Sequence, residues 1–285
     1  MLSILIPTYN FNCVALVKSL QQQAEEEKIE YEIVVADDAS SVFVAENSEI
    51  NMLKNARFLP LSKNIGRANI RNLLASEAKF RYLLFIDGDA KVFTPTFLSE
   101  HIRHCAPNCC IVGGVTYEKN TNATFSLRAK YGEKCEAKKH YFSAFNLLID
   151  RQLFLQIKFD KNLHHYGYED FVFGIEAEKL TTIKYISNPL IHKGLDENIT
   201  FLEKTEKAIR NLWMLQTNNP DIQKRSQLLR TFFLLKKWHL EKFVAKFFGK
   251  WRSIITTNLT SKNPSLFLFS CYKIGLLCNI AQKSV

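Results

Sequence analysis

The sequence predicts an α/β fold, in which a mostly parallel sheet is flanked by helices and followed by a C-terminal helical extension. Apolar runs of strand length alternate with stretches of helical spacing over the first 90 residues, which is typical of parallel strands that are buried on both faces. Three of these runs end abruptly in polar residues. The composition, with 47% hydrophobic and 23% charged residues in a chain of 285, excludes disordered and disulfide-stapled proteins.

The first part of the chain alternates strands and helices. Residues 2–6 form a short apolar run that ends at Pro7, and residues 14–28 space their apolar side chains as a helix does. The pattern continues with strands at 33–36 and 58–61, a helix at 68–78 and a strand at 82–86. This order predicts an open sheet with parallel central strands.

The pattern loosens after residue 90. We expect strands at 111–117, 142–149 and 183–186, and helices at 151–157 and in the segment that ends at Lys179.

The charge is divided unevenly along the chain. The formal net charge is +10, yet residues 1–200 carry 23 Lys and Arg against 24 Asp and Glu, whereas residues 201–285 carry 15 against 4. All of the excess positive charge therefore lies in the second of these segments. We expect one domain over residues 1–200 and a basic, aromatic helical extension over residues 201–285.

Polar residues follow three of the predicted strands. The first strand ends in Pro7-Thr8-Tyr9-Asn10, the strand at 33–36 in Asp37-Asp38 and the strand at 82–86 in Asp87-Gly88-Asp89. Because open α/β sheets bind ligands outside the carboxyl ends of their strands, we expect these segments to meet at one edge and to form the functional site.

Asp87 and Asp89 are candidates for a metal site. In extended chain their spacing points both carboxylates the same way, and two like charges in a partly dry site need a divalent cation or a shared proton. Oxygen ligands favour Mg²⁺ or Mn²⁺. The alternative is a solvated turn after a strand, where Asp and Gly are common. Asp37-Asp38 is equally open, since a carboxylate there can bind a nucleoside or cap a helix.

Five segments together resemble family 2 glycosyltransferases. They are residues 3–10 (SILIPTYN), 33–41 (IVVADDASS), 64–72 (NIGRANIRN), 84–89 (LFIDGD) and 166–171 (YGYEDF), in the order and at about the spacing of that family. The resemblance covers about residues 1–200. It implies a GT-A fold, with a Rossmann-like mixed sheet, and an inverting bacterial enzyme that uses a nucleotide sugar.

The resemblance also implies the nucleotide side of the site. Thr8 and Tyr9 match the segment that lies against the base, and Asp38 matches the aspartate that hydrogen-bonds uracil. The element that helps to hold the nucleotide and diphosphate is matched by Asn64, Gly66 and Arg71. Asp87 matches the aspartate that faces the ribose or donor sugar. Arg67 departs from the apolar residue that is commoner at its position, and is either a phosphate or sugar contact or a surface cation.

The acceptor side and the metal follow from the same resemblance. Asp170 is similar to the general base of inverting members and stands beside Glu169; without the resemblance, both are explained as acids at the start of a helix. Asp89 matches the metal ligand, with Asp87 near it. His192 matches a histidine that completes the site and favours Mn²⁺ over Mg²⁺, although a core or exposed histidine is the alternative.

The segment before the acidic pair carries groups that can contact a sugar. Tyr166 and Tyr168 offer aromatic faces on either side of the flexible Gly167. His164 and His165 have two interpretations, namely a contact with the acceptor or packing within the loop.

The basic extension resembles a helix that lies on a membrane. Apolar residues between 228 and 255 recur with helical spacing and lysines crowd their other side, which predicts attachment to an anionic membrane surface through residues 228–281. Residues 265–281 are short for a span and contain Lys273, so we expect a peripheral segment. The alternative is that these helices pack on the catalytic domain. No motif accompanies the charge that would predict nucleic-acid binding.

These observations predict an inverting, metal-dependent glycosyltransferase that moves a sugar from a nucleotide sugar, a UDP-sugar above others, to a saccharide or lipid-linked acceptor in bacterial surface polysaccharide assembly. We expect it in the cytoplasm at the inner face of the cell membrane, because no secretory signal precedes the first strand and the seven cysteines are irregularly spaced. One alternative is a sugar-phosphate nucleotidyltransferase, which usually has a Gly-rich basic loop where Pro7-Thr8-Tyr9-Asn10 stands here. The other is a membrane-docked saccharide-binding module without turnover.

Overall fold

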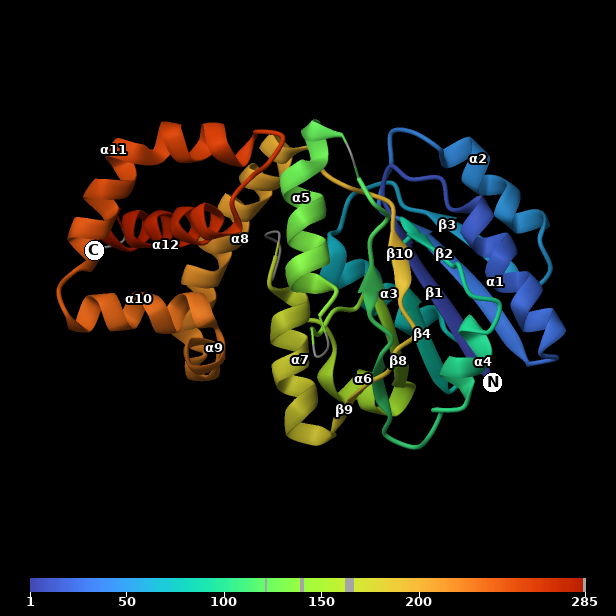
Figure 1. Cartoon of the computed structure of the whole chain (residues 1–285). Coiled ribbons are helices and arrows are strands. Elements are labelled where there is room, and N and C mark those ends of the chain that lie inside the picture. Colours follow the sequence, from blue (N-terminus) through green and yellow to red (C-terminus); the bar gives the residue numbers. More distant parts are fainter. Residues whose placement is uncertain (121, 139–140, 162–166, 284–285) are drawn as a thin grey trace. The chain divides into compact units, whose positions relative to one another are not determined.

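The computed structural model describes residues 1–120, 122–138, 141–161 and 167–283 (Figure 1). They form two compact units. The first consists of Met1–Glu118, Glu136–His164 and Glu169–Gly194, and the second of Lys119–Cys135, His165–Tyr168 and Leu195–Val285.

A seven-stranded sheet forms the centre of the first unit. Its strands, in spatial order, are β3 (Ala56–Pro60), β2 (Tyr31–Asp37), β1 (Leu2–Thr8), β4 (Tyr82–Ile86), β8 (Asn146–Asp150), β6 (Cys110–Val112) and β9 (Ile183–Tyr185). The first four are parallel, β8 is antiparallel to both of its neighbours, and β6 and β9 are parallel. The structure therefore confirms the mostly parallel α/β sheet.

Helices cover both faces of this sheet (Figure 1). The helical elements of the unit are α1 (Val14–Glu26), α2 (Val44–Ser48), η1 (Glu49–Met52), α3 (Arg67–Glu77), α4 (Phe97–Ile102), α6 (Arg151–Ile157) and α7 (Glu169–Leu180). Successive residues of β1 point to opposite faces, so that Ile4 packs with α1 and α4 while Leu5 packs with α3, α6 and α7. Each such fully buried side chain stabilises the fold by about 1.5–3 kcal/mol relative to an exposed one.

A second, three-stranded sheet brings distant segments together. It consists of β5 (Ala90–Lys91), β10 (Leu190–His192) and β7 (Val115–Thr116). The single strand predicted at 111–117 is wrong, because the chain turns at Gly113-Gly114, where Gly114 has a φ of +92°, and its two parts join different sheets. The strand predicted at 142–149 begins only at Asn146.

The second unit is helical. Its elements are η2 (Ala123–Phe125), α5 (Ser126–Tyr131), the π-helical turn η3 (Gly132–Glu136), α8 (Asn198–Asn218), α9 (Pro220–Arg225), α10 (Gln227–Lys237), α11 (Glu241–Leu259) and α12 (Leu266–Lys283). The helical stripe predicted over 228–255 is broken between α10 and α11, where His239 has a φ of +58°. In the described part of the chain, no helix is both long enough and apolar enough to span a bilayer.

Gly88 illustrates how closely the chain packs at the end of β4. A Cβ at this position would lie 2.7 Å from Thr8 Oγ1 and 3.2 Å from the Pro7 carbonyl oxygen, so Gly88→Ala is expected to lower the free energy of unfolding by about 1–3 kcal/mol. Gly249, inside α11, has no atom within 4 Å of such a Cβ, and Gly249→Ala is expected to raise the free energy by about 0.5–1 kcal/mol. Urea unfolding of both variants measures the difference, and equal effects would contradict the packing argument.

Candidate active site

The polar segments that follow β1, β2 and β4 meet at one edge of the large sheet. These strands are parallel neighbours, with β1 between β2 and β4. The N–H of Asp38 donates to the Thr8 carbonyl oxygen at 2.9 Å, and the N–H of Gly88 donates to the Pro7 carbonyl oxygen at 3.0 Å. The predicted convergence of the three strand ends is confirmed.

Asp38, Asn64 and Gly66 form one polar cluster. The carboxylate of Asp38 is buried and accepts hydrogen bonds from the N–H groups of Ile65, at 2.6 Å, and Gly66, at 3.0 Å. Asn64 donates to the Asp38 carbonyl oxygen at 2.9 Å. Burial raises the pKa of Asp38, and the two N–H groups oppose this shift. Gly66 has a φ of +84°, a conformation that suits glycine and starts α3 at this point.

Thr8 and Tyr9 differ in exposure. Thr8 is buried and its hydroxyl donates to the Phe11 carbonyl oxygen at 3.3 Å, whereas the Tyr9 side chain is exposed. Tyr9 therefore presents an aromatic ring to solvent directly after β1, and Thr8 supports the backbone there.

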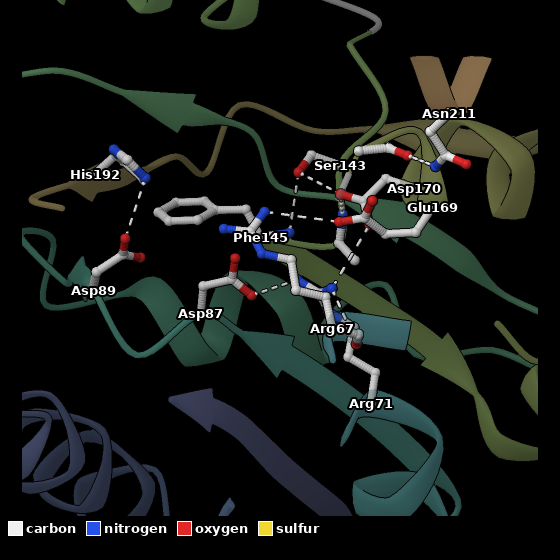
Figure 2. A network of polar contacts seen from close by, with 12 residues as sticks. Arg67, Arg71, Asp87, Asp89, Ser143, Phe145, Glu169, Asp170, His192 and Asn211 are labelled. Carbon is white, nitrogen blue, oxygen red and sulfur yellow. Dashed lines mark hydrogen bonds and ion pairs between the residues drawn. The ribbon is translucent and has the colours of Figure 1, made fainter. Parts of the chain in front are cut away.

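Arg71 joins two of the predicted site carboxylates. It projects from α3 and its side chain is only 3% exposed. Its Nη2 lies 2.7 Å from Asp87 Oδ1, and its Nη1 lies 3.9 Å from Asp170 Oδ1 (Figure 2). The guanidinium also lies over the ring of Phe159, with its carbon 5.5 Å from the centroid. A buried cation needs such partners, so Asp87 and Asp170 together offset its desolvation.

One oxygen of Asp170 is held in place by two donors. The Ser143 hydroxyl donates to Oδ2 at 3.0 Å and the N–H of Ala144 donates to the same atom at 2.9 Å. Oδ1 is buried and accepts no hydrogen bond within the described residues. Burial raises the pKa of Asp170, and Arg71 is the strongest group that opposes the shift. The carboxylate is therefore fixed in orientation and more basic than an exposed aspartate.

Arg67 lies one helical turn before Arg71 on α3 and reaches the other acid of the pair. Its Nη1 lies 3.7 Å from Glu169 Oε1; the Arg67 side chain is 54% exposed, whereas Glu169 is buried. Both acids stand in the first turn of α7, where the helix dipole favours negative charge. Figure 2 shows the two arginines between Asp87 and this acidic pair.

Asp89 and His192 point toward each other (Figure 2). His192 Nε2 lies 3.3 Å from Asp89 Oδ2, because β5 and β10 pair antiparallel and set His192 opposite Ala90. Burial alone would raise the pKa of Asp89, but the hydrogen bond and charge of His192 outweigh it and hold the pKa below its usual value. The His192 ring is kept in place by Phe145 and Tyr117, whose centroids lie 5.3 and 5.7 Å away.

This pair fits a divalent cation in part. Asp89 Oδ1 and His192 Nδ1 are buried and have no hydrogen-bond partner among the described residues. A carboxylate and an imidazole suit Mn²⁺ better than Mg²⁺. Over the described ranges, no group of three or more His, Cys, Asp or Glu side chains is arranged to hold a metal. Asp87, expected near the metal, is instead paired with Arg71, so any cation here needs substrate oxygens to complete its coordination.

A match to a family of known proteins covers more than half of the chain. Residues 3–165 match the model of the family described as "Glycosyl transferase family 2". The chain belongs to glycosyl transferase family 2. The family 2 match includes the strand ends from Thr8 to Asp89, whereas Glu169, Asp170 and His192 lie beyond its last residue. No curated protein sequence matches this family 2 glycosyltransferase significantly.

Solved structures show the same fold at low sequence identity. A crystal structure of S. aureus TarS 1-349 is 16% identical and covers 99% of this chain and 91% of its own, with a TM-score of 0.52. The mannosyltransferase PcManGT from Pyrobaculum calidifontis, in complex with GDP-Man and Mn²⁺, is 13% identical and covers 99% and 86%, with a TM-score of 0.56. The chain spans 39% of the length of a longer TarS structure. At these identities the likeness shows the GT-A fold of this family 2 member and its C-terminal helical region.

Two groups in the site were missed by sequence reasoning. Ser143 and the N–H of Ala144, which hold Asp170, fall inside the apolar run that predicts a strand over 142–149. Because β8 begins only at Asn146, Ser143 is free to turn toward α7. A lone serine in an apolar run is the only signal that the sequence offered. His164, His165 and Tyr166, for which acceptor contacts were considered, lie outside the described residues.

Proposed function

We propose that the protein transfers a sugar from a UDP-sugar to a hydroxyl group of a saccharide or lipid-linked acceptor, with inversion at the anomeric carbon. The observation that carries this proposal is the buried Arg71, which lies against both Asp87 and Asp170, while Asp89, two residues after Asp87, contacts His192 (Figure 2). Inverting transfer needs a base for the acceptor on one face of the sugar and positive charge for the leaving diphosphate on the other. The chain has candidates for both.

Asp170 is the proposed general base. The acceptor hydroxyl forms a bond to the anomeric carbon, its proton passes to the Asp170 carboxylate, and the bond from that carbon to the diphosphate oxygen breaks. Ser143 and Ala144 fix the carboxylate through Oδ2, so its orientation does not have to be reached during the reaction. Glu169 lies next to it and is the proposed second acidic group on the acceptor side, held by Arg67.

Asp89 and His192 are the proposed ligands of a divalent cation, with Mn²⁺ preferred. Such a cation supplies charge stabilisation for the departing diphosphate. PcManGT, of the same fold, is described in complex with Mn²⁺. Arg67 is more than half exposed and forms an ion pair with Glu169. Its positive charge also lowers the pKa of Asp89. We propose that it contacts the diphosphate or sugar.

The donor nucleotide is assigned to the ends of β1 and β2. Tyr9 offers its exposed ring to the base, next to Thr8. Asp38, with Asn64 and Gly66, is proposed to read uracil, since a carboxylate accepts a hydrogen bond from the imide N–H. A TarS 1-349 structure is described in complex with UDP, at 15% identity and a TM-score of 0.51, which supports a UDP-sugar for this chain.

The deciding experiment measures UDP release from a panel of UDP-sugars with Mn²⁺ present. We expect release from one or a few of them, and loss of that release in Asp89→Ala. Formation of a nucleotide sugar, with release of pyrophosphate, from a nucleoside triphosphate and a sugar phosphate would support a nucleotidyltransferase instead. Binding of saccharide with no release from any nucleotide sugar would support a module without turnover.

The ionisation of Asp170 makes the reaction depend on pH. A base must be ionised to accept a proton, so activity is lost as the pH falls through the pKa of Asp170, which burial raises and Arg71 lowers. Arg71→Met is expected to move the acid limb of kcat/KM upward by about one pH unit or more, because the opposing charge is lost. Arg71→Lys keeps the charge and should leave the limb nearer its original place. An unmoved limb in a folded Arg71→Met variant would contradict this role.

The place of action is proposed as well. The basic helical unit suits work at the inner face of a bacterial cell membrane, where lipid-linked saccharides for surface polysaccharides are extended. The supporting observation is the excess of Lys and Arg over Asp and Glu after residue 200.

A further inference from the structure

Helix α11 presents a continuous apolar row to solvent. The exposed fractions of its side chains are 67% for Phe243, 52% for Phe247, 40% for Trp251 and 60% for Ile254. The ring centroids of Phe243 and Phe247 lie 6.4 Å apart and those of Phe247 and Trp251 lie 5.7 Å apart, both pairs stacked. These spacings of three or four residues put all four side chains on one side of the helix. We name Phe243, Phe247, Trp251 and Ile254 the α11 row.

The core of the helical unit does not use this row. A different side of α11 is buried, through Ala245, Phe248, Ile255 and Leu259. Phe248 packs edge-on against Tyr272 of α12, with ring centroids 5.4 Å apart. A folded helix with one buried side does not need four further large apolar residues on another, so the α11 row is available to a partner.

Helix α12 is not part of the same surface. Eight of its residues are buried, namely Phe269, Tyr272, Gly275, Leu276, Leu277, Cys278, Ile280 and Ala281. Lys273, which argues against a span, lies over the rings of Tyr131 and Phe269 at 5.1 and 4.7 Å. Membrane contact through residues 228–281 stays a prediction, and the eight buried residues of α12 are not available for it.

Lysines run beside the α11 row. Lys242, Lys246 and Lys250 are exposed, and each directly precedes a member of the α11 row in the sequence. The end of α10 adds exposed Lys236 and Lys237, and exposed Trp238 follows them. Between residues 227 and 259, Glu241 is the single acidic residue against seven Lys and Arg. Charge complementarity thus points to an anionic partner, and a second copy of the face would bring the same lysines into contact.

We infer that α11 docks on an anionic phospholipid bilayer, lying flat with the α11 row in the headgroup boundary and the lysines on lipid phosphates. Aromatic residues suit the boundary, and lysine stems can lie along apolar surface while their ammonium groups reach the headgroups. This inference rests on the proposed work at a membrane and not on the proposed transfer chemistry.

The test uses the full chain and sedimentation with vesicles of phosphatidylcholine, alone or mixed with phosphatidylglycerol. We expect binding to the mixed vesicles that weakens with salt, and about 10-fold or greater loss in a Phe243→Ser, Phe247→Ser, Trp251→Ser variant. A Lys242→Glu, Lys246→Glu, Lys250→Glu variant should lose about 100-fold, since each basic residue adds to the attraction of the anionic surface. Met52→Ser with Lys54→Glu, in exposed positions of the first unit, is the matched control and should bind as the original chain does.

UDP release from a soluble UDP-sugar, measured on the same preparations, separates the two proposals. All of these variants should release UDP at the original rate, because they change exposed residues outside the site. Failure of the original chain to sediment with mixed vesicles, or equal binding by the α11 variants, would overturn docking whatever the UDP assay shows. A dimer that the α11 row variant abolishes, without vesicle binding by the original chain, would overturn it in favour of a second copy.

Discussion

Replacing Asp170 by Asn is expected to reduce sugar transfer by about 100-fold or more, the usual scale for loss of a general base, while UDP binding stays unchanged. The amide keeps an oxygen that can accept from Ser143 and Ala144, so the local structure should persist. What is lost is the capacity to take a proton from the acceptor. Steady-state transfer rates and calorimetric UDP binding measure the two quantities.

Glu176→Gln provides a matched control for this variant. Glu176 stands on the same helix, α7, with a side chain that is 38% exposed and paired with Lys179 at 2.8 Å. Its replacement removes a carboxylate charge without touching the Asp170 contacts, so transfer should not change. Turnover at the original rate in Asp170→Asn would end the assignment of the base.

The large sheet could be predicted from sequence because its signal is local. The runs that became β1, β2 and β4 are mostly apolar and bounded by polar residues, and α3 follows a helical spacing. The small sheet could not be predicted in this way. β5 and β7 have two residues each and β10 has three, and such strands exist only through pairing with distant segments.

The site shows the same division. The strand ends with Thr8, Asp38 and Asp87 were predicted to converge from topology alone, and they do. The meeting of Asp89 with His192 depends on the pairing of β5 with β10, which no local pattern encodes; only the resemblance to a family supplied it. The burial of Arg71 between carboxylates was also not evident, since a sequence does not say which face of α3 meets α7.

Replacing Asp89 by Asn is expected to reduce UDP release by about 100-fold or more and to remove its dependence on Mn²⁺. Metal assistance is worth several kcal/mol, and about 1.4 kcal/mol corresponds to a factor of ten. Because a ligand that binds the folded state stabilises it, Mn²⁺ added together with UDP, whose oxygens complete its coordination, should raise the Tm of the original protein above the value with UDP alone and should not do so in Asp89→Asn. This second readout does not depend on turnover. The control is Glu118→Gln, which should respond to Mn²⁺ as the original protein does. Glu118 is an exposed acid that pairs with Lys193, the residue that follows His192.

His192→Ala tests whether the pair acts as one unit. If Asp89 and His192 hold the same ion, the double variant should be no worse than the poorer single variant, because the second change removes a ligand from a site that is already lost. Effects that add would mean that the two side chains act separately, with His192 serving only to orient Asp89 across their 3.3 Å contact. A Mn²⁺-induced Tm shift that survives in both single variants would place the cation elsewhere and remove this pair from the leaving-group side of the reaction.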